Sequence, residues 1–242
     1  MSWEIEKLRK PRVAVGMLFK EETVFRDMIK AAFAFQREPG WIFFFQTSIP
    51  LVDVARNVVA SQALQSGAEY LFYWDSDLAV DPQIVPKLIA HGLPVVSALY
   101  WRRHPPIFPE VFRVNPKTGI PAPMKAEEIR ALRGGQLIEC DAVGLGCCLI
   151  HRSVLEKLAK RSPKFTMISP DDPEDKLEVI EFMKMIFQNN VTISEDVMFC
   201  SRVQHELGLK IFVDPNIECP HLCGAQVADG GMGFPALERG RE

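Results

Sequence analysis

The chain has 242 residues, of which 48% are hydrophobic and 24% are charged, proportions typical of soluble globular proteins. Its 28 Lys and Arg residues are nearly balanced by 31 Asp and Glu residues, which gives a formal net charge of −3. This balance does not support a broad nucleic-acid surface or a polybasic membrane anchor. The length allows one large domain or two small ones.

The first residues and the cysteines indicate a cellular compartment. The opening segment, MSWEIEKLRK, alternates charged residues with single apolar positions and contains no apolar region typical of a secretory signal. The longest apolar stretches, such as 95–101, are far too short to cross a bilayer. Most of the six cysteines lie inside apolar runs, which indicates buried free thiols in a reducing environment. We therefore expect a cytoplasmic protein without a transmembrane segment.

Apolar strands and amphipathic helices alternate in the first part of the chain. Short apolar runs predict strands at 12–19, 41–48, 70–74 and 94–101. Helical spacing predicts helices at 21–36, from Val54 to about Gln65 with Asp53 as the cap, and from Asp81 to about His91. This alternation predicts an α/β domain with a mostly parallel central sheet flanked by helices. Ligands of such sheets bind beyond the carboxyl ends of the strands.

The alternation is interrupted after residue 101. Prolines recur between 102 and 136, which predicts a surface excursion with an edge strand or two, such as 109–114. The segment 136–158 predicts a strand, a glycine-marked turn, a second strand and a helix, and 190–215 predicts a turn, a helix and a late strand. The acidic segment 162–178 is predicted to be an exposed loop. We predict one domain over 1–223, followed by a flexible glycine-rich tail over 224–242.

Two carboxylates follow the third predicted strand, in the sequence YLFYWDSD. Asp75 and Asp77 are two positions apart, so their oxygens can approach one point where the strand ends. Two ionised carboxylates repel each other unless a proton or a cation lies between them. Mg²⁺ or Mn²⁺ binds such oxygens and keeps positions open for substrate phosphates. An alternative is that both residues are turn and capping residues, whereas Val80 and Pro86 exclude an EF-hand loop.

A second acidic pair, Glu195 and Asp196, follows Ser194 at the start of a predicted helix. The pair either caps this helix or supplies a general base for an acceptor hydroxyl. His221, in the sequence CPHLC after the late strand, is either a packed histidine or a third metal ligand. A structural zinc site is not expected, because no second pair of cysteines stands nearby.

The order of these motifs over roughly residues 12–222 resembles that of the GT-A-fold glycosyltransferases, which use nucleotide-sugar donors. In this resemblance, WDSD is similar to the D-x-D motif of the family. The resemblance implies that Asp75, Asp77 and His221 bind Mn²⁺ or Mg²⁺. It also implies that Asp75 and Ser76 contact the diphosphate or the ribose of the donor.

The resemblance assigns further roles to residues on other predicted elements. Ser194-Glu195-Asp196 looks like the x-E-D motif, which implies that Asp196, with Glu195 beside it, is the catalytic base. The helix after the second strand resembles one that faces the nucleotide, through Arg56 and Asn57. The glycine-bearing turn after 142 resembles a loop near the donor sugar, through Gly144 and Gly146.

The implied function is metal-dependent transfer of a sugar, with inversion, from a UDP- or GDP-sugar to a hydroxyl of a glycan or another acceptor. A retaining route remains open if Asp196 is only a cap. One alternative is a sugar nucleotidyltransferase, which favours a glycine-rich phosphate loop that the segment 17–23 lacks. Another alternative is a nucleotide- or glycan-binding module without catalysis. Candidates for acceptor recognition are the segment 170–178 and the residues Trp101, Arg102 and Arg103.

Overall fold

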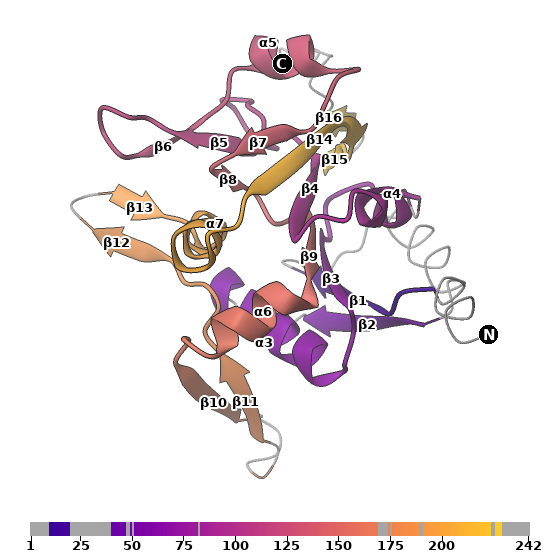
Figure 1. The fold of residues 1–242 in the computed structure, drawn as a ribbon, viewed down its shortest axis with the longest axis vertical. Helices are drawn as coiled ribbons and strands as arrows, with labels where there is room; N and C mark the ends of the chain where they lie inside the picture. The colour runs from indigo at the N-terminus through magenta and orange to yellow at the C-terminus, as the bar shows by residue number, and fades with distance from the viewer. Residues whose placement is uncertain are drawn as a thin grey trace, which may run out of the picture.

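A seven-stranded sheet forms the centre of the molecule, in the order β2-β1-β3-β9-β4-β14-β7 (Figure 1). The computed structural model describes residues 10–19, 40–46, 49, 51–81, 83–168, 174, 176–188, 191–223 and 226–228. The predicted helix at 21–36 and most of the predicted tail lie outside the described residues.

The strands of the central sheet are β1 (Val13–Leu18), β2 (Trp41–Gln46), β3 (Tyr70–Asp75), β4 (Val95–Leu99), β7 (Ile138–Cys140), β9 (Cys147–His151) and β14 (Ile211–Glu218). β1 pairs in parallel with β2 and β3, and β4 pairs in parallel with β14. β9 runs antiparallel to β3 and β4, and β7 runs antiparallel to β14. Five of the seven strands thus share one direction, which confirms the predicted α/β fold.

The described residues contain five helices: α3 (Val52–Gln65), α4 (Ile84–Ala90), α5 (Ala126–Leu132), α6 (Arg152–Ala159) and α7 (Glu195–Leu207). Buried side chains of α3, α5, α6 and α7 share one apolar core, and those of α4 belong to another. The α4 core lies on the opposite side of the sheet, because successive side chains of a strand point to opposite faces. The sheet is therefore covered on both sides.

β3 shows how the sequence divides between the two cores. Leu71 and Tyr73 join the core under α3, whereas Phe72 and Trp74 join the core under α4. All four side chains are at most 1% exposed. Burying each of them contributes roughly 1.5–3 kcal/mol. A slip of one residue would exchange the two faces, so the apolar run fixes where β3 ends and the acidic residues begin.

The predictions of local structure at Asp53 and at 162–178 are wrong. α3 begins at Val52, with Leu51 as its N-cap residue, so Asp53 does not cap it. The Asp53 carboxylate accepts hydrogen bonds from the backbone N–H groups of Val54 and Met185 instead. The predicted loop at 162–178 contains two antiparallel strands, β10 (Lys164–Ile168) and β11 (Lys176–Ile180). Most of their side chains alternate between exposed and half-buried, and only Val179 is fully buried. The acidic and proline residues between the strands obscure this pattern.

Three smaller sheets complete the described fold. They comprise β5 (Val111–Val114), β6 (Pro121–Pro123) and β8 (Ala142–Val143); β12 (Ile186–Gln188) and β13 (Val191–Ile193); and β15 (His221–Cys223) and β16 (Gln226–Ala228). β5 is the middle strand of its sheet rather than the predicted edge strand. β16 lies beyond residue 223, the predicted end of the domain.

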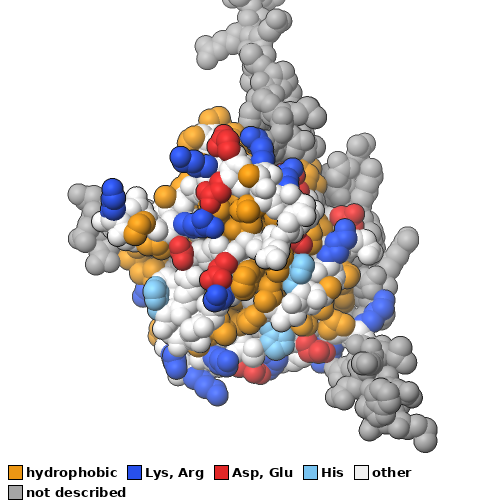
Figure 2. All heavy atoms as spheres, turned by 45° about the horizontal axis from the view of Figure 1, so that its top comes forward, with side chains coloured by type: hydrophobic (Ala, Val, Ile, Leu, Met, Phe, Trp, Pro, Cys, Tyr) orange, Lys and Arg blue, Asp and Glu red, His pale blue; other side chains and the backbone are white. Residues whose placement is uncertain are grey.

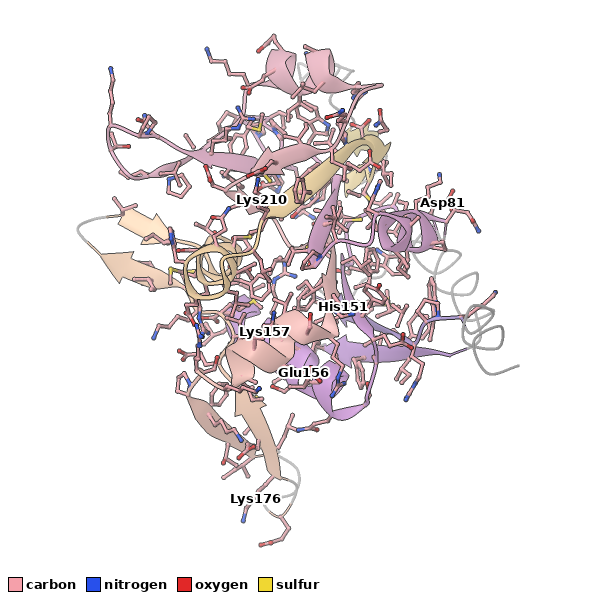
Figure 3. All side chains as sticks on the ribbon, viewed as in Figure 1. Asp81, His151, Glu156, Lys157, Lys176 and Lys210 are labelled. Atoms are coloured by element: carbon pink, nitrogen blue, oxygen red, sulfur yellow. The ribbon has the colours of Figure 1, made fainter. Side chains whose placement is uncertain are left out.

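The surface mixes charges of both signs. Figure 2 shows basic and acidic side chains interspersed over one face of the molecule. Glu156 and Lys157 project from α6 beside His151, whose ring caps this helix by accepting a hydrogen bond from the Ser153 N–H (Figure 3). Among the described residues, no helix has both the length and the apolar character needed to span a bilayer.

Candidate functional site

The first acidic residue of the site is fixed at the carboxyl end of β3. Asp75 is the last residue of this strand and pairs with Leu18, the last residue of β1. The Asp75 N–H donates to the Gly146 carbonyl at 2.9 Å, and the Ser76 N–H donates to the Leu18 carbonyl at 3.2 Å. A Cβ at Gly146 would overlap the Asp75 carboxylate. Glycine at position 146 therefore lets the carboxylate lie directly against the backbone before β9.

The turn after β3 brings Asp77 to His221. Leu78 forms a β-bridge with His221, and the Leu222 N–H donates to the Asp77 carbonyl at 2.6 Å. These backbone contacts place Asp77 Oδ1 3.6 Å from His221 Nε2. Two of the three predicted metal ligands are thus neighbours, although they come from distant parts of the sequence. The third, Asp75, lies on the same strand end.

Trp101 fixes the orientation of the His221 ring. The Trp101 carbonyl can only accept a hydrogen bond, so the His221 Nδ1 that contacts it carries the hydrogen and Nε2 faces Asp77. Burial lowers the pKa of His221, but the interaction with Asp77 outweighs this effect and the pKa is raised. Burial raises the pKa of Asp77, but His221 and Arg103 outweigh it and the pKa is lowered. The raised pKa of His221 and the lowered pKa of Asp77 are the shifts expected when the two side chains form an ion pair.

Arg56 of α3 connects two acidic residues of the site. Its Nη2 lies 3.1 and 3.2 Å from the two carboxylate oxygens of Asp75, and its Nε lies 3.1 Å from Glu195 Oε1. The guanidinium group also lies over the Tyr73 ring, and Arg56 is only 4% exposed. This burial does not support the predicted nucleotide contact. Arg56 instead holds the two carboxylates in place, while its buried Nη1 has no hydrogen-bond partner among the described residues.

Asn57 also has a structural role. The side chain is 2% exposed, its Nδ2 donates to the Met183 carbonyl at 2.7 Å, and its Oδ1 accepts from the N–H groups of Phe182 and Met183. All three bonds hold the segment before β12 against α3. The predicted nucleotide contact of Asn57 is therefore not supported by its position.

The second acidic pair occupies the first turn of α7. Glu195 is 5% exposed and bound to Arg56. Burial, followed by the nearby Asp196, raises the pKa of Glu195 even though Arg56 opposes the shift. Asp196 is half-buried, and its Oδ1 accepts hydrogen bonds from the Ser194 hydroxyl and the Val197 N–H. Neither hydrogen bond involves Asp196 Oδ2, and no described residue donates to this oxygen.

Tyr100 and Glu110 complete the site and were not predicted. The Tyr100 ring meets His221 edge-on at 5.7 Å, and its hydroxyl accepts a hydrogen bond from the Gly146 N–H at 3.1 Å. Glu110 is joined through its backbone to Tyr100 and Gly144. A Cβ at Gly144 would overlap the Tyr100 hydroxyl. Both predicted glycines are therefore required for packing, and their contact with a donor sugar remains a prediction.

Glu110→Gln is expected to stabilise the protein at alkaline pH. Burial, followed by the charge of Asp196, raises the pKa of Glu110 from 4.5 to about 7. The fold thus favours the neutral acid, and stability falls as the pH rises from 4.5 through 7. Glutamine stays neutral, so the variant should gain about 1–2 kcal/mol above pH 7, after allowance for partial exposure. Urea unfolding in a chelator at pH 5 and 8.5 measures this gain, and an equal gain at both pH values would contradict the assignment.

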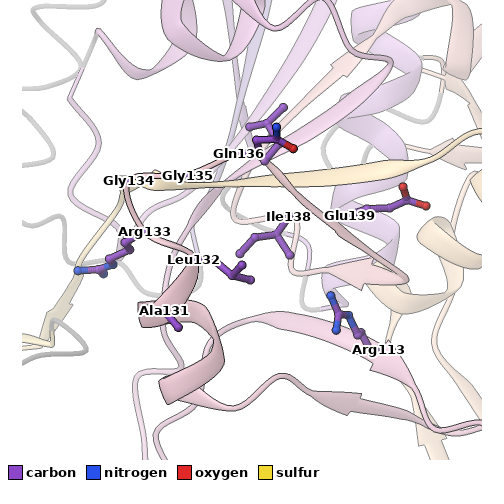
Figure 4. Close-up of a pocket in the computed structure, with 10 residues that line it drawn as sticks. Arg113, Ala131, Leu132, Arg133, Gly134, Gly135, Gln136, Ile138 and Glu139 are labelled. Carbon is purple, nitrogen blue, oxygen red and sulfur yellow. The ribbon is translucent and has the colours of Figure 1, made fainter.

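A pocket of about 510 Å³ lies between α5, the turn at 133–136 and β7 (Figure 4). None of the predicted site residues lines it. Arg133, in its wall, forms an ion pair with Glu218 at 2.6 Å, and Glu218 accepts a hydrogen bond from the Trp101 indole, also at 2.6 Å. Since the Trp101 carbonyl holds His221, a chain of polar contacts links the pocket wall to the candidate site.

Among the comparisons with known proteins, only those with solved structures gave matches. No family model matches the chain, and no curated protein matches its sequence. The structure of A197 from STIV is similar over 88% of this chain and 86% of that chain, with a TM-score of 0.51 and 18% identity. GalNAc-T7 with UDP, GalNAc and Mn²⁺ is similar over 88% of this chain but only 44% of that chain, with a TM-score of 0.49 and 12% identity. The chain has a GT-A-like α/β fold.

Proposed function

We propose that this protein is a metal-dependent glycosyltransferase that transfers a sugar from a UDP- or GDP-sugar to an acceptor hydroxyl, with inversion. The observation that carries the proposal is the approach of Asp77 Oδ1 to His221 Nε2, at 3.6 Å, beside Asp75 at the carboxyl end of a GT-A-like sheet. Ligands of open α/β sheets bind at such strand ends. The side chains of Asp75 and Asp77 are each 28% exposed, so a ligand can reach both carboxylates.

The donor groups fit a divalent cation. A histidine that binds a metal commonly donates its other ring N–H to a carbonyl, and His221 is held in this way by Trp101. Its Nε2 and an oxygen of Asp77 therefore face the same point. The described residues hold no group of three His, Cys, Asp or Glu side chains arranged for a metal. Asp77 and His221 would thus hold Mn²⁺ or Mg²⁺ together with donor phosphates, as these cations are often bound.

The chemistry divides between a leaving group and an attacking hydroxyl. The cation, when bound, supplies positive charge for the departing nucleoside diphosphate. Asp196 accepts the proton of the acceptor hydroxyl as that oxygen attacks the anomeric carbon from the side opposite the diphosphate. Glu195 cannot take this role in the observed arrangement, because its carboxylate is buried and bound to Arg56. Arg56 orients Asp75 and Glu195.

Calorimetric titration with UDP, GDP and their sugar conjugates, with and without Mn²⁺, tests the proposal. We expect one nucleotide to bind only when the metal is present. Transfer or slow hydrolysis of the matching sugar donor would then establish the activity. Absence of any metal-dependent nucleotide binding would reject the proposal. Release of pyrophosphate from a nucleoside triphosphate and a sugar phosphate would identify a nucleotidyltransferase, and binding without turnover would identify an inactive module.

Asp196→Asn is expected to abolish transfer without weakening donor binding. Asparagine keeps an oxygen for the Ser194 and Val197 hydrogen bonds but cannot accept the acceptor proton. Loss of a general base lowers the rate by about 10²–10⁴-fold. Initial rates and the Kd for UDP with Mn²⁺ separate the two effects. Glu206→Gln, on the same helix but paired with Arg202, should behave as the wild type, and an active Asp196→Asn enzyme would assign the residue to capping alone.

We propose that the reaction takes place in the cytoplasm. All five cysteines whose side chains are described are buried and free. Cys147 and Cys219 lie close enough for their thiols to interact, yet they are not joined. Reduced thiols in contact support a reducing compartment.

A further inference from the structure

Arg103 forms an ion pair with Asp77, one of the candidate metal ligands. It lies in the segment between β4 and β5, two residues after the Trp101 that orients His221. Its Nη1 lies 3.0 Å from Asp77 Oδ2, and the side chains of Arg103 and Asp77 are 27% and 28% exposed. The pair is therefore open to solvent on one side, and a ligand can compete for either partner.

Both oxygens of Asp77 are engaged in the described structure. Oδ1 faces His221 Nε2, and Oδ2 accepts from Arg103. A divalent cation bound at Asp77 would stand beside the guanidinium group, and two positive charges at this separation repel each other strongly. The carboxylate thus has two competing cationic partners, and a metal ion must displace Arg103 or weaken its contact.

The structure also indicates where the displaced arginine can go. The Arg102 N–H bonds to the Phe108 carbonyl, and Trp101 forms a β-bridge with Pro109, so the base of the 102–108 segment is held in place. The Arg103 side chain would therefore stay near the site after leaving Asp77. A guanidinium group binds two phosphate oxygens at once more readily than it binds a single carboxylate oxygen. The diphosphate of a nucleotide is a partner of this chemistry.

We propose that Arg103 exchanges partners, binding Asp77 in the free protein and the nucleotide diphosphate in the loaded site. This inference rests on the proposed function and adds that binding of the metal ion and binding of the nucleotide diphosphate are coupled through Arg103. The metal alone binds weakly, because it must displace Arg103 without offering it a new partner. The metal and a diphosphate together bind well, because the released guanidinium gains the phosphate oxygens. Arg103 thus makes binding of the two ligands cooperative, and the coupling acts equally in both directions.

The test measures Mn²⁺ binding by electron paramagnetic resonance, first with the metal alone and then with UDP or GDP, whichever the protein binds. For Arg103→Gln, we expect Mn²⁺ alone to bind about two- to fivefold more tightly, the range for loss of a half-exposed ion pair. The increase in Mn²⁺ affinity caused by the nucleotide should fall by about tenfold. Arg103→Lys keeps the charge and should retain the weak affinity for Mn²⁺ alone.

Arg102→Gln is the matched control, because it removes one positive charge from the neighbouring residue. Arg102 is exposed and lies over the Phe108 ring at 5.2 Å. Both measurements are made without an acceptor, so removal of this candidate acceptor-binding side chain should leave them near wild type. Equal effects of the two substitutions would overturn the inference in favour of a general charge effect. So would unchanged or weaker Mn²⁺ binding by Arg103→Gln. If neither the wild type nor this variant binds Mn²⁺ with any nucleotide, the proposed function itself fails, and the inference fails with it.

Discussion

Asp77→Asn is expected to lower the affinity for UDP or GDP in saturating Mn²⁺ by about 100-fold or more, which corresponds to ~2.7 kcal/mol. Asp77 is the carboxylate that faces His221 Nε2, whereas both oxygens of Asp75 are bound by Arg56. Asparagine removes the negative charge that attracts the cation, but it leaves the backbone bond from the Leu222 N–H intact. Calorimetry at fixed metal and varied nucleotide measures the change directly.

The matched control is Asp81→Asn, in the same segment after β3. Asp81 is exposed, and its Oδ1 accepts only the Gln83 N–H among the bonds described, which asparagine can also accept. This variant should bind the nucleotide as the wild type does. Asp77→Asn should also keep most of its stability, because the ion pair with Arg103 is half-exposed. Full metal-dependent nucleotide binding by a folded Asp77→Asn protein would remove Asp77 from the metal site.

The fold could be predicted where local pattern and burial agree. β1 and β3 are short apolar runs whose side chains are largely buried on both faces of the sheet, so their sequences predict strands. The prediction of a loop at 162–178 was wrong, because β10 and β11 are half-exposed strands and not continuous apolar runs. Such strands carry charged residues on one face, and the acidic and proline residues at 170–174 pointed to a loop. Exposed and less exposed positions alternate in both strands, but each strand has only five residues, which is too short for the alternation to stand out in the sequence.

The candidate site divides in a similar way. Asp75 and Asp77 could be found because they lie at the end of a buried strand and because the sequence shows two carboxylates two positions apart. Arg103 and Glu110 come from a proline-rich segment. The sequence suggested Arg103 only as a candidate for acceptor recognition, and nothing local predicts that either residue lies near Asp77 or Asp196. Their positions depend on long-range contacts, such as the backbone bonds that join Glu110 to Tyr100 and Gly144. These contacts exist only after the sheet has formed.

Arg56 shows a different limit of sequence reasoning. The resemblance to the GT-A-fold family places Arg56 on a helix that faces the nucleotide, and the sequence carries no mark of the burial of this side chain. In the structure, the neutralising partners of Arg56 are Asp75 and Glu195. Arg56 therefore pairs with carboxylates of the candidate site and not with a phosphate. In this arrangement Arg56 balances the charge of the two carboxylates and orients them. Its removal is therefore expected to have a large effect on the stability of the protein.

Arg56→Met is expected to reduce the free energy of unfolding by about 3–5 kcal/mol, because it leaves buried carboxylate charge without a partner. The loss should be larger at pH 8 than at pH 5. Burial and Asp196 already raise the pKa of Glu195, and Arg56 opposes them, so the substitution raises this pKa further. An acid with a raised pKa in the folded state loses stability as the pH rises from its unfolded value of 4.5 through the folded value. Urea unfolding at the two pH values, followed by tryptophan fluorescence, measures both effects.

Two further variants distinguish this mechanism from simple loss of packing. Arg113→Met removes an arginine that is 51% exposed and paired with Glu128, and it should cost less than about 1 kcal/mol at either pH. The double variant Arg56→Met/Glu195→Gln removes one of the uncompensated charges, so it should recover part of the lost stability and most of the pH dependence should disappear. A double variant as unstable and as pH-dependent as Arg56→Met would mean that Glu195 is not the charge that Arg56 balances. In that case the stability lost in Arg56→Met would not come from the buried ion pair between Arg56 and Glu195.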